Sequence, residues 1–368
     1  MPTLAEFVDV LDSIAPPSLA EPWDNVGLLV GDRAQPVRRA LLTIDYTPAV
    51  AVEAKEKSCD VIVAYHPPIF EAVKRITASK PNDLLFDAIR RGIAIYSPHT
   101  ALDVADGGTN DVLADVLSLS ERRPLKLRDA KSTEFKLVTF VPENAVEKVS
   151  EALFAAGAGR IGNYSSCSFR SRGQGTFFGE AGTNPTVGQA GKLEIADEVR
   201  IETVVPIRSI STVVAALRTA HPYEEPAFDL QTLAAPPLAI GLGRVGRTPG
   251  DATAEMLVNL LKRALGVGSV LLAGDPQKLV RKVAVCAGAC GGDLLKEAIA
   301  QNVDLYITGE MRHHDALLAV RAGLTVVCTL HSNSERITLP RYADLIRAKM
   351  SSVELLMSSV DADPFTIA

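Results

Sequence analysis

Short apolar strands alternate with helical segments in two separate stretches of this chain, and this alternation restricts the fold more than any other feature. In the first stretch, strands at 39–45, 60–66 and 93–99 alternate with helices at 49–57, 83–92 and 109–117. In the second, strands at 281–287, 303–310 and 324–331 alternate with helices at 292–301 and 313–323, and a last helix precedes SVELLMSS. Such alternation builds mainly parallel sheets that helices cover on both faces. The sequence therefore predicts an α/β core of two related lobes.

The segment between these stretches has a different order of elements. It has a strand at 134–142, a helix at 145–157, two shorter strand candidates at 165–172 and 175–180, a strand at 197–206, a helix at 210–220 and a strand at 226–233. We interpret this as the β-α-β-β-α-β order of a ferredoxin-like α+β domain. LKLRDAKST before it and AAPPLA after it are predicted linkers. The predicted parts are a first lobe at 1–130, an inserted ferredoxin-like domain at 131–235 and a second lobe at 236–368.

Length and composition exclude several classes of protein. The chain has 368 residues, 47% of them hydrophobic, and a formal net charge of −6, which fits two or three units but not a general nucleic-acid binder. Its five cysteines are too few for a disulfide framework, so reduced thiols are expected. The N-terminus lacks the features of a signal peptide and predicts a helix with a Thr3–Glu6 capping box. Because no apolar run is long enough to span a bilayer, we expect a soluble cytoplasmic protein that does not bind membranes.

Polar residues recur at the ends of corresponding strands in the two halves. Aligning DVIVAYH with DLYITGE places His66 opposite Glu310. In the next strand of each half a histidine comes four residues before a carboxylate, and these pairs are His99–Asp103 and His331–Glu335. Residues four apart at the start of a helix lie on one face. If the halves pack as related lobes, these side chains converge.

This set of residues predicts a metal site. Histidine and carboxylate side chains at sheet ends suit zinc, iron or manganese. A single histidine is more often packed in a core, and a single carboxylate usually faces solvent. Four such residues at matching strand ends favour a metal site over four separate structural roles. Five of the six histidines lie in or beside this set, namely His66, His99, His313, His314 and His331.

Seven stretches carry a resemblance to a known family: EPWDNVGLLVGD, AYHPPIF, SPHTALDVADGGTND, GAGRIGNYSSCSF, AHPYEEPAFDL, ITGEMRHHDAL and LHSNSERITLP. In order and spacing the chain resembles the Nif-three-like dinuclear metal-centre proteins, also called GTP cyclohydrolase I type 2 homologues. The resemblance implies two divalent ions (zinc, iron or manganese) held by His66, Asp103, His331 and Glu335. It also implies a ring-shaped homohexamer and an insert similar to the signalling-protein or copper-tolerance type of ferredoxin-like domain.

The sequence departs from the family pattern at one position of this ligand set. The family often has His-His where this chain has Tyr65-His66. Tyr65 can ligate as a phenolate, donate a hydrogen bond or line the pocket, and the sequence leaves these alternatives open. Glu310 and His314, near the end of a second-lobe strand, are expected to orient ligand imidazoles or to act as general acid or base groups, the first being preferred.

Four further stretches have both a functional and a structural interpretation. GLGRVG (241–246) matches a dinucleotide-binding pattern, but RTPGD follows it instead of a helix, so a tight connection into the core is expected. CAGACGGD (286–293) can bind an anion at a helix N-terminus, with Cys286 and Cys290 as small packing residues. HPYEEP (221–226) can lie over the metal cavity or form a surface turn. In EPWDNVG (21–27), Trp23 can shape the cavity wall or anchor the core.

The predicted metal site is compatible with two functions of different classes. The first is a metal-dependent hydrolase of a phosphoester or of a C–N bond in a nucleotide-like ring, with His99 as the candidate acid or base because its counterpart His331 is a ligand. The second is a non-catalytic protein that binds, delivers or senses metal. An open coordination position would distinguish them, since a catalytic metal keeps one. The substrate and the metal are not specified by the sequence.

Overall fold

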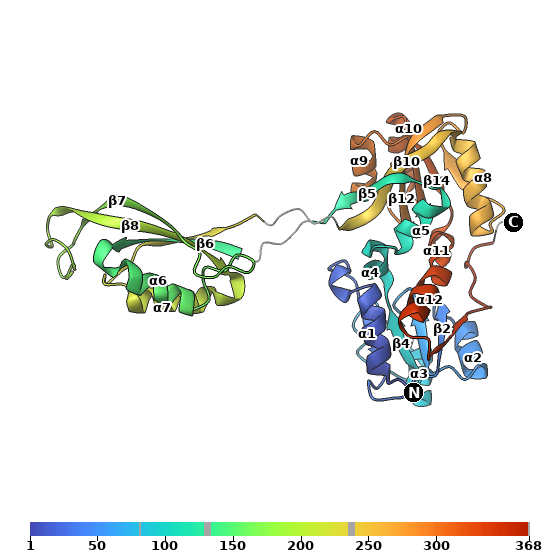
Figure 1. The fold of residues 1–368 in the computed structure, drawn as a ribbon. Coiled ribbons are helices and arrows are strands. Elements are labelled where there is room, and N and C mark those ends of the chain that lie inside the picture. The colour runs from blue at the N-terminus through green and yellow to red at the C-terminus, as the bar shows by residue number, and fades with distance from the viewer. Residues whose placement is uncertain (81, 129–133, 235–239, 367–368) are drawn as a thin grey trace. The chain divides into compact units, whose positions relative to one another are not determined.

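The computed structural model describes residues 1–80, 82–128, 134–234 and 240–366. The chain divides into two compact units, each treated by itself below (Figure 1). Residues 1–128 and 238–368 form the core unit, and residues 129–237 form the insert unit. In the described residues, no helix combines the length and the apolar character that crossing a membrane requires.

The first sheet of the core unit has five strands in the order β1-β4-β3-β2-β15. They are β1 (Gly27–Val30), β4 (Ala94–Ser97), β3 (Val61–Ala64), β2 (Arg39–Thr43) and β15 (Glu354–Met357). The last four are parallel to one another, and β1 is antiparallel to β4. Every residue of β3 and β4 is buried, as expected for strands covered on both faces.

Helices cover both faces of this first sheet. On one face, α1 (Leu4–Ile14) and α12 (Thr338–Lys349) bury Phe7 and Tyr342 against the strands. On the other, α2 (Pro48–Glu56) and α3 (Asp83–Arg91) bury Val50 and Leu85. The capping box predicted at the start of α1 is confirmed. A short helix, η1 (Pro17–Leu19), follows α1.

The second sheet of the core unit has six strands in the order β11-β14-β13-β12-β10-β5. They are β11 (Leu271–Ala273), β14 (Thr325–Cys328), β13 (Leu305–Glu310), β12 (Leu279–Ala289), β10 (Gly241–Thr253) and β5 (Ser120–Leu127). The three strands β12, β13 and β14 are parallel, and the outer strands pair antiparallel. Helices α5 (Thr109–Val116) and α8 (Ala254–Leu265) cover one face, and α9 (Gly292–Ala300) and α10 (His313–Arg321) the other.

Each half of the chain gives one strand to the sheet of the other half. β5 from the first half pairs with β10, and β15 from the end of the chain pairs with β2. The linker predicted at 125–133 is wrong at its start, because Leu125–Leu127 belong to β5; residues 129–133 and most of the linker AAPPLA lie outside the described residues. GLGRVG is part of β10, where Arg244 is buried against α5, so it is a strand and not a tight connection.

Two short helices connect the sheets to the site. The strands predicted to run to His99 and His331 end earlier, at Ser97 and Cys328. α4 (His99–Val104) and α11 (His331–Arg336) begin at these two histidines. Each helix therefore starts just after the carboxyl end of a parallel strand, where open α/β sheets place binding residues.

The insert unit is a four-stranded antiparallel sheet in the order β7-β8-β6-β9. Its elements are β6 (Glu134–Pro142), η2 (Glu143–Ala145), α6 (Val146–Ala155), β7 (Phe169–Phe178), β8 (Leu193–Pro206), η3 (Ile207–Ser209), α7 (Ile210–Ala220) and β9 (Phe228–Thr232). Helices α6 and α7 pack on one face through Val149, Leu153, Val213 and Leu217. The strand–helix order is the one predicted, except that the two short strand candidates are the single strand β7.

Candidate metal centre

Three predicted site residues converge at the strand ends of the core unit. His66 lies two residues beyond β3, His331 starts α11, and Glu335 lies one turn further along α11. One ligand atom from each of the three lies within 4.8 Å of the others. His66 comes from the first half of the chain and the other two from the second, so the site joins residues that are far apart in sequence.

The atoms that face one another in this cluster suit a cation. His66 Nε2 lies 3.1 Å from Glu335 Oε2, and His331 Nε2 lies 3.3 Å from Glu335 Oε1. His66 Nε2 and Glu335 Oε2 are buried and have no hydrogen-bond partner with suitable geometry among the described residues. Buried polar atoms are normally satisfied. Two imidazole nitrogens and a carboxylate that point at one position are a donor set of the kind that binds zinc, iron or manganese.

A carboxylate holds the far side of each imidazole. His66 Nδ1 lies 2.9 Å from Asp45 Oδ1, and His331 Nδ1 lies 3.0 Å from Glu310 Oε1. Because a carboxylate accepts a hydrogen bond, each Nδ1 carries a proton, which leaves each Nε2 as the nitrogen that can bind a proton or a cation beside Glu335. This arrangement fixes ligand imidazoles in metal sites. Asp45 was missed by the sequence analysis, and Glu310 takes the orienting position that was preferred for it.

The charges of these carboxylates shift the pKa values of both histidines upward. Burial opposes protonation of His66, but its contacts with Asp45 and Glu335 prevail and raise its pKa to about 10. The contact with Glu335 raises the pKa of His331 to about 9, against the effect of burial. Burial would raise the pKa of Glu335, but the two histidines hold it below its ordinary value. The pocket therefore favours positive charge, which either protons or a cation can supply.

Asp103 and Tyr65 form a second polar group beside the cluster. The Tyr65 hydroxyl donates a short hydrogen bond to Asp103 Oδ1 and lies 2.9 Å from Thr109 Oγ1. Burial and the charges of Asp103 and Glu335 raise the pKa of Tyr65 well above its ordinary value. Burial and the charge of Glu335 raise the pKa of Asp103 to about 6. Tyr65 is thus a neutral hydrogen-bond donor here, and the carboxyls of Asp103 and Glu335 repel one another until a cation or a proton is shared.

His99 lies next to His66. Its ring centroid is 5.3 Å from that of His66, as is the ring centroid of His331. Its Nδ1 lies 2.7 Å from Asp24 Oδ1, and Asp24 also accepts the Thr100 N–H at 3.1 Å. Asp24 was missed, although it lies in the EPWDNVG stretch. Its position leaves His99 Nε2 as the free nitrogen.

Two predicted residues lie away from the cluster or at its edge. His314 is exposed on α10, where its ring lies against that of His313. Trp23 is 59% exposed and contacts the rings of His99 and Phe70, so its side chain is not a core anchor.

The anion site considered at the start of α9 has a carboxylate beside it. A Cβ on Gly291 would lie 2.6 Å from Asp315 Oδ2, so Asp315 already faces this helix N-terminus.

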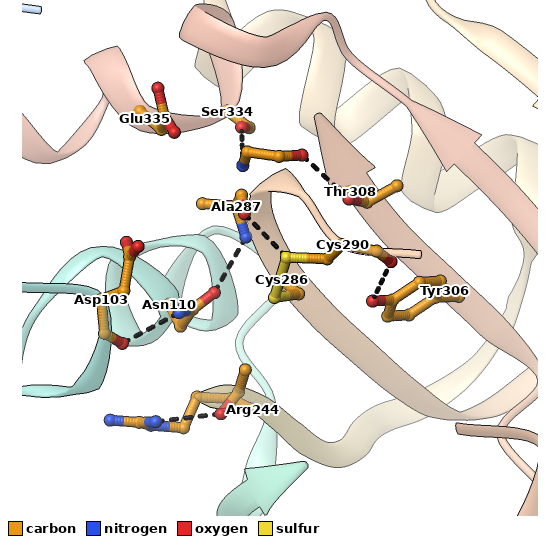
Figure 2. The surroundings of a disulfide bond; sticks show 12 residues. Asp103, Asn110, Arg244, Cys286, Ala287, Cys290, Tyr306, Thr308, Ser334 and Glu335 are labelled. Atoms are coloured by element: carbon orange, nitrogen blue, oxygen red, sulfur yellow. Dashed lines mark hydrogen bonds between the residues drawn. A yellow bond between two sulfur atoms is a disulfide. The ribbon is translucent and has the colours of Figure 1, made fainter. Parts of the chain in front are cut away.

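An irregular, glycine-containing turn within β12 lies beside Glu335 of the cluster (Figure 2). Gly288 has φ +70°, and a Cβ there would lie 2.8 Å from Glu335 Oε1 and 3.3 Å from His331 Nε2. The Gly288 N–H donates to Ser334 Oγ at 2.8 Å, and the Ala287 N–H donates to Asn110 Oδ1 at 3.0 Å. Because only glycine leaves room for Glu335 at this φ, the backbone of this turn sets one boundary of the site.

A disulfide closes the same turn, as Figure 2 shows. Cys286 and Cys290 are bonded, with their Cα atoms 6.0 Å apart, whereas Cys59, Cys167 and Cys328 are free. The prediction of reduced packing cysteines is wrong for this pair. The β12 turn brings residues four apart to a separation that a disulfide spans, which a count of cysteines does not reveal.

The fold and the cluster define an α/β protein with a candidate metal site, and the comparisons with known proteins identify its family. The chain belongs to the Duf34/NIF3 (NGG1p interacting factor 3) family, whose model matches residues 2–364. A Halalkalibacterium halodurans protein named GTP cyclohydrolase 1 type 2 homolog is 38% identical over 364 residues, which are 98% of this chain and 97% of that protein. A Bacillus subtilis protein of the same name is 37% identical over 366 residues, with the same coverage.

Solved structures show the same relationship. The crystal structure of a Bacillus cereus protein related to NIF3 is 36% identical to this chain, with a TM-score of 0.68, and covers 100% of this chain and 99% of its own. The crystal structure of Staphylococcus aureus protein SA1388 is 27% identical, with a TM-score of 0.74 and the same coverage. The predicted family is therefore confirmed over nearly the whole chain, insert included.

Proposed function

We propose that this chain is a metal-dependent hydrolase that uses two divalent ions to cleave a phosphoester or a C–N bond in a nucleotide-like ring. One observation carries the proposal. His66 Nε2 and Glu335 Oε2 are buried, 3.1 Å apart and without hydrogen-bond partners among the described residues, while His331 Nε2 faces the same carboxylate. The name shared by the relatives, GTP cyclohydrolase 1 type 2 homolog, supports a nucleotide-like substrate.

In this proposal, different residues would hold the two ions. His66, His331 and Glu335 would hold the first. Asp103, whose pKa is raised to about 6 by burial and by the charge of Glu335, would share Glu335 with the second. Two neighbouring carboxyl groups that disfavour each other's charge gain most when cations come between them.

The chain's own groups supply the rest of the proposed chemistry. When bound, divalent ions supply Lewis-acid activation of water and of the scissile group. His99, whose Nδ1 proton is held by Asp24 at 2.7 Å, presents Nε2 as the group that takes or gives a proton. Trp23, with its ring centroid 6.1 Å from that of His99, offers an exposed aromatic surface on which a ring of the substrate can stack.

Metal content per chain tests the binding part of this proposal. Elemental analysis of purified protein is expected to find up to two divalent ions per chain. Glu335→Gln, which keeps the side-chain volume but removes the shared charge, should lose both. The matched control is His313→Ala, which removes an exposed histidine of α10 and should leave the content unchanged. Unchanged metal content in Glu335→Gln would contradict the assignment.

A substrate screen separates the hydrolase from its rival, a non-catalytic protein that binds or delivers metal. The screen should include bis(p-nitrophenyl) phosphate and GTP, with the metal-loaded protein. Because His99 is not a proposed ligand, His99→Asn should retain the metal and lose turnover by about 10²-fold or more. Full metal content without turnover on any phosphoester or nucleotide would favour the rival function.

Tyr65 makes the two metal positions unequal. Its hydroxyl is neutral and already donates to Asp103, so the position served by Asp103 lacks the second histidine that the family pattern often has. We expect one ion to leave early during mild chelation of the native protein and to be retained in Tyr65→His. Simultaneous loss of both ions from the native protein would show that Tyr65 is not the weak point. The homohexamer stays a prediction, which sedimentation velocity would check.

A further inference from the structure

The insert unit contains a half-open cavity of about 640 Å³ that the metal chemistry does not use. It lies on the sheet face opposite α6 and α7. Phe140 of β6, Phe177 of β7 and Glu198 of β8 contribute to its floor, the loop between β7 and β8 lies on one side through Val187, and Tyr223 comes from the HPYEEP stretch. Its volume is in the range of small-molecule sites.

The HPYEEP corner is held in place by a buried histidine. His221 is 6% exposed, its Nε2 lies 3.0 Å from the Phe140 carbonyl oxygen, and its Nδ1 accepts the Tyr223 N–H at 3.1 Å. These two contacts require the tautomer with the proton on Nε2, and burial lowers the pKa of His221, which keeps the ring neutral. The ring of Tyr223 packs edge-on against His221, with centroids 4.9 Å apart. The stretch is therefore a fixed wall of the cavity.

The loop between β7 and β8 is tied to this corner. The Asn184 N–H donates to Glu224 Oε2 at 3.1 Å, and Thr186 Oγ1 donates to the Pro222 carbonyl oxygen at 2.8 Å. At the base of the loop, the Gly191 N–H donates to the Gly179 carbonyl oxygen at 2.8 Å. The cavity is thus shaped before any ligand arrives, which reduces the ordering cost of binding.

The charged groups of the lining differ in their partners. The Tyr223 hydroxyl is inaccessible to solvent, and burial and the neighbouring Glu198 carboxylate raise its pKa. The arginines of the lining are engaged elsewhere, since Arg172 pairs with Glu143 and Arg200 pairs with Glu202 at 2.8 Å. In the described part of the chain, Glu198 has no basic partner. A carboxylate without a basic partner in an aromatic-lined cavity favours a ligand that donates hydrogen bonds and carries positive charge.

We propose that this cavity binds a small aromatic amine. The ring of the ligand would pack on Phe140, Phe177 and Val187, and its ammonium group would donate to the Glu198 carboxylate. The glycines of β7 make room for this ligand. A Cβ on Gly175 would lie 2.3 Å from Glu198 Oε2, so the Glu198 carboxylate lies directly against the backbone of β7 at this glycine. A Cβ on Gly173 would meet no heavy atom within 4 Å, so the space above Gly173 is open.

Calorimetric titration of the full-length protein tests the proposal with two probes that share one ring. Tryptamine carries an ammonium group on its side chain, and indole-3-propionate carries a carboxylate. We expect tryptamine to bind at least about tenfold more tightly than indole-3-propionate, because the carboxylate meets Glu198. Equal affinity for the two probes, or no binding of tryptamine, would overturn the proposal.

Three variants separate a site from a surface effect. Glu198→Gln should weaken tryptamine binding about tenfold or more, whereas Glu151→Gln, which changes an exposed carboxylate of α6 on the other face of the sheet, should not. Gly173→Leu fills open space in the floor and should abolish binding while the melting temperature of the protein stays the same. Binding that survives Gly173→Leu, or that falls equally in Glu151→Gln, would place tryptamine elsewhere and overturn the assignment.

Discussion

Substitution of Arg244 should lower the free energy of unfolding of the core unit strongly, because this buried arginine is paired with the buried carboxylate of Asp111. Its guanidinium donates to both carboxylate oxygens of Asp111, at 2.8 and 2.9 Å, and to the carbonyl oxygens of Gly241 and Gly243. It also donates to the carbonyl oxygens of Val104 and Ala105 at 3.2 and 3.3 Å, just after the α4 residue Asp103. The side chains of Arg244 and Asp111 are 8% and 12% exposed.

The expected loss for Arg244→Met follows from these contacts. Methionine keeps most of the buried volume but leaves the Asp111 carboxylate without its cation, and breaking a buried pair in this way costs about 3–5 kcal/mol. Asp111 still accepts the Gly107 N–H at 2.9 Å, which partly satisfies its carboxylate. We therefore expect a loss in the free energy of unfolding at the lower end of this range, about 3 kcal/mol. For a unit of this size that corresponds to a fall in melting temperature of roughly 6–12 °C.

Urea unfolding followed by circular dichroism measures this loss, and the same strand offers a control. Arg247→Met removes an arginine whose pairing with Glu121 is exposed, at 60% and 73%, so its cost should stay below about 1 kcal/mol. Replacing both partners, Arg244→Met with Asp111→Leu, should recover part of the loss because no unpaired buried charge is left. If Arg244→Met is within about 1 kcal/mol of the native protein, the reasoning about buried charge is refuted.

Three further predictions concern charge, covalent closure and domain structure. Since the folded pKa values of His66 and His331 are raised to about 10 and about 9, their stabilising contribution is complete below about pH 6.5 and is lost as the pH rises through 9 to 10. The melting temperature of metal-free protein should therefore fall across that range more steeply than that of metal-loaded protein; equal slopes would contradict this. Reduction of Cys286–Cys290 should cost about 2 kcal/mol for so short a loop, and unfolded, unreduced protein should expose three thiols to alkylation, not five. Replacing 129–237 by a short Gly-Ser linker should leave a folded core unit with unchanged metal content, because the Arg128 N–H donates to the Ile240 carbonyl oxygen at 2.9 Å; an unfolded product would place the insert within the core.

Local patterns in the sequence predicted most helices and strands of both units. The apolar runs around Val61–Ala64 and Thr325–Cys328 are buried strands, since an apolar run bounded by turn residues is the signature of a parallel strand covered on both faces. The exchange of β5 and β15 between the sheets was not predicted. Strand pairing depends on which edge is free after the rest has folded, and neither SERRPLKL nor ELLM encodes its partner.

The sequence analysis singled out the three residues of the candidate cluster and missed the groups that contact them. The internal repeat pointed to His66, His331 and Glu335, whose ligand atoms the structure brings within 4.8 Å. Asp45 and Asp24 were not singled out because each contacts an imidazole through the fold, without a fixed spacing to it in the sequence. A carboxylate just beyond a buried strand, as Asp45 is beyond β2, was the signal that could have identified the first of them.

The pairing of β15 with β2 has a consequence for the order in which the protein is completed during synthesis. β2 lies between β3 and β15, and its residues Ala40, Leu41 and Leu42 are fully buried. Until residues 354–357 leave the ribosome, β2 is an open edge with unpaired N–H and C=O groups, which other chains can pair with. A ribosome that stalls before residue 354, or a nonsense mutation before it, leaves that edge open. The sheet of the first lobe is therefore closed only after residues 354–357, which follow the whole second lobe in the sequence, have been synthesised.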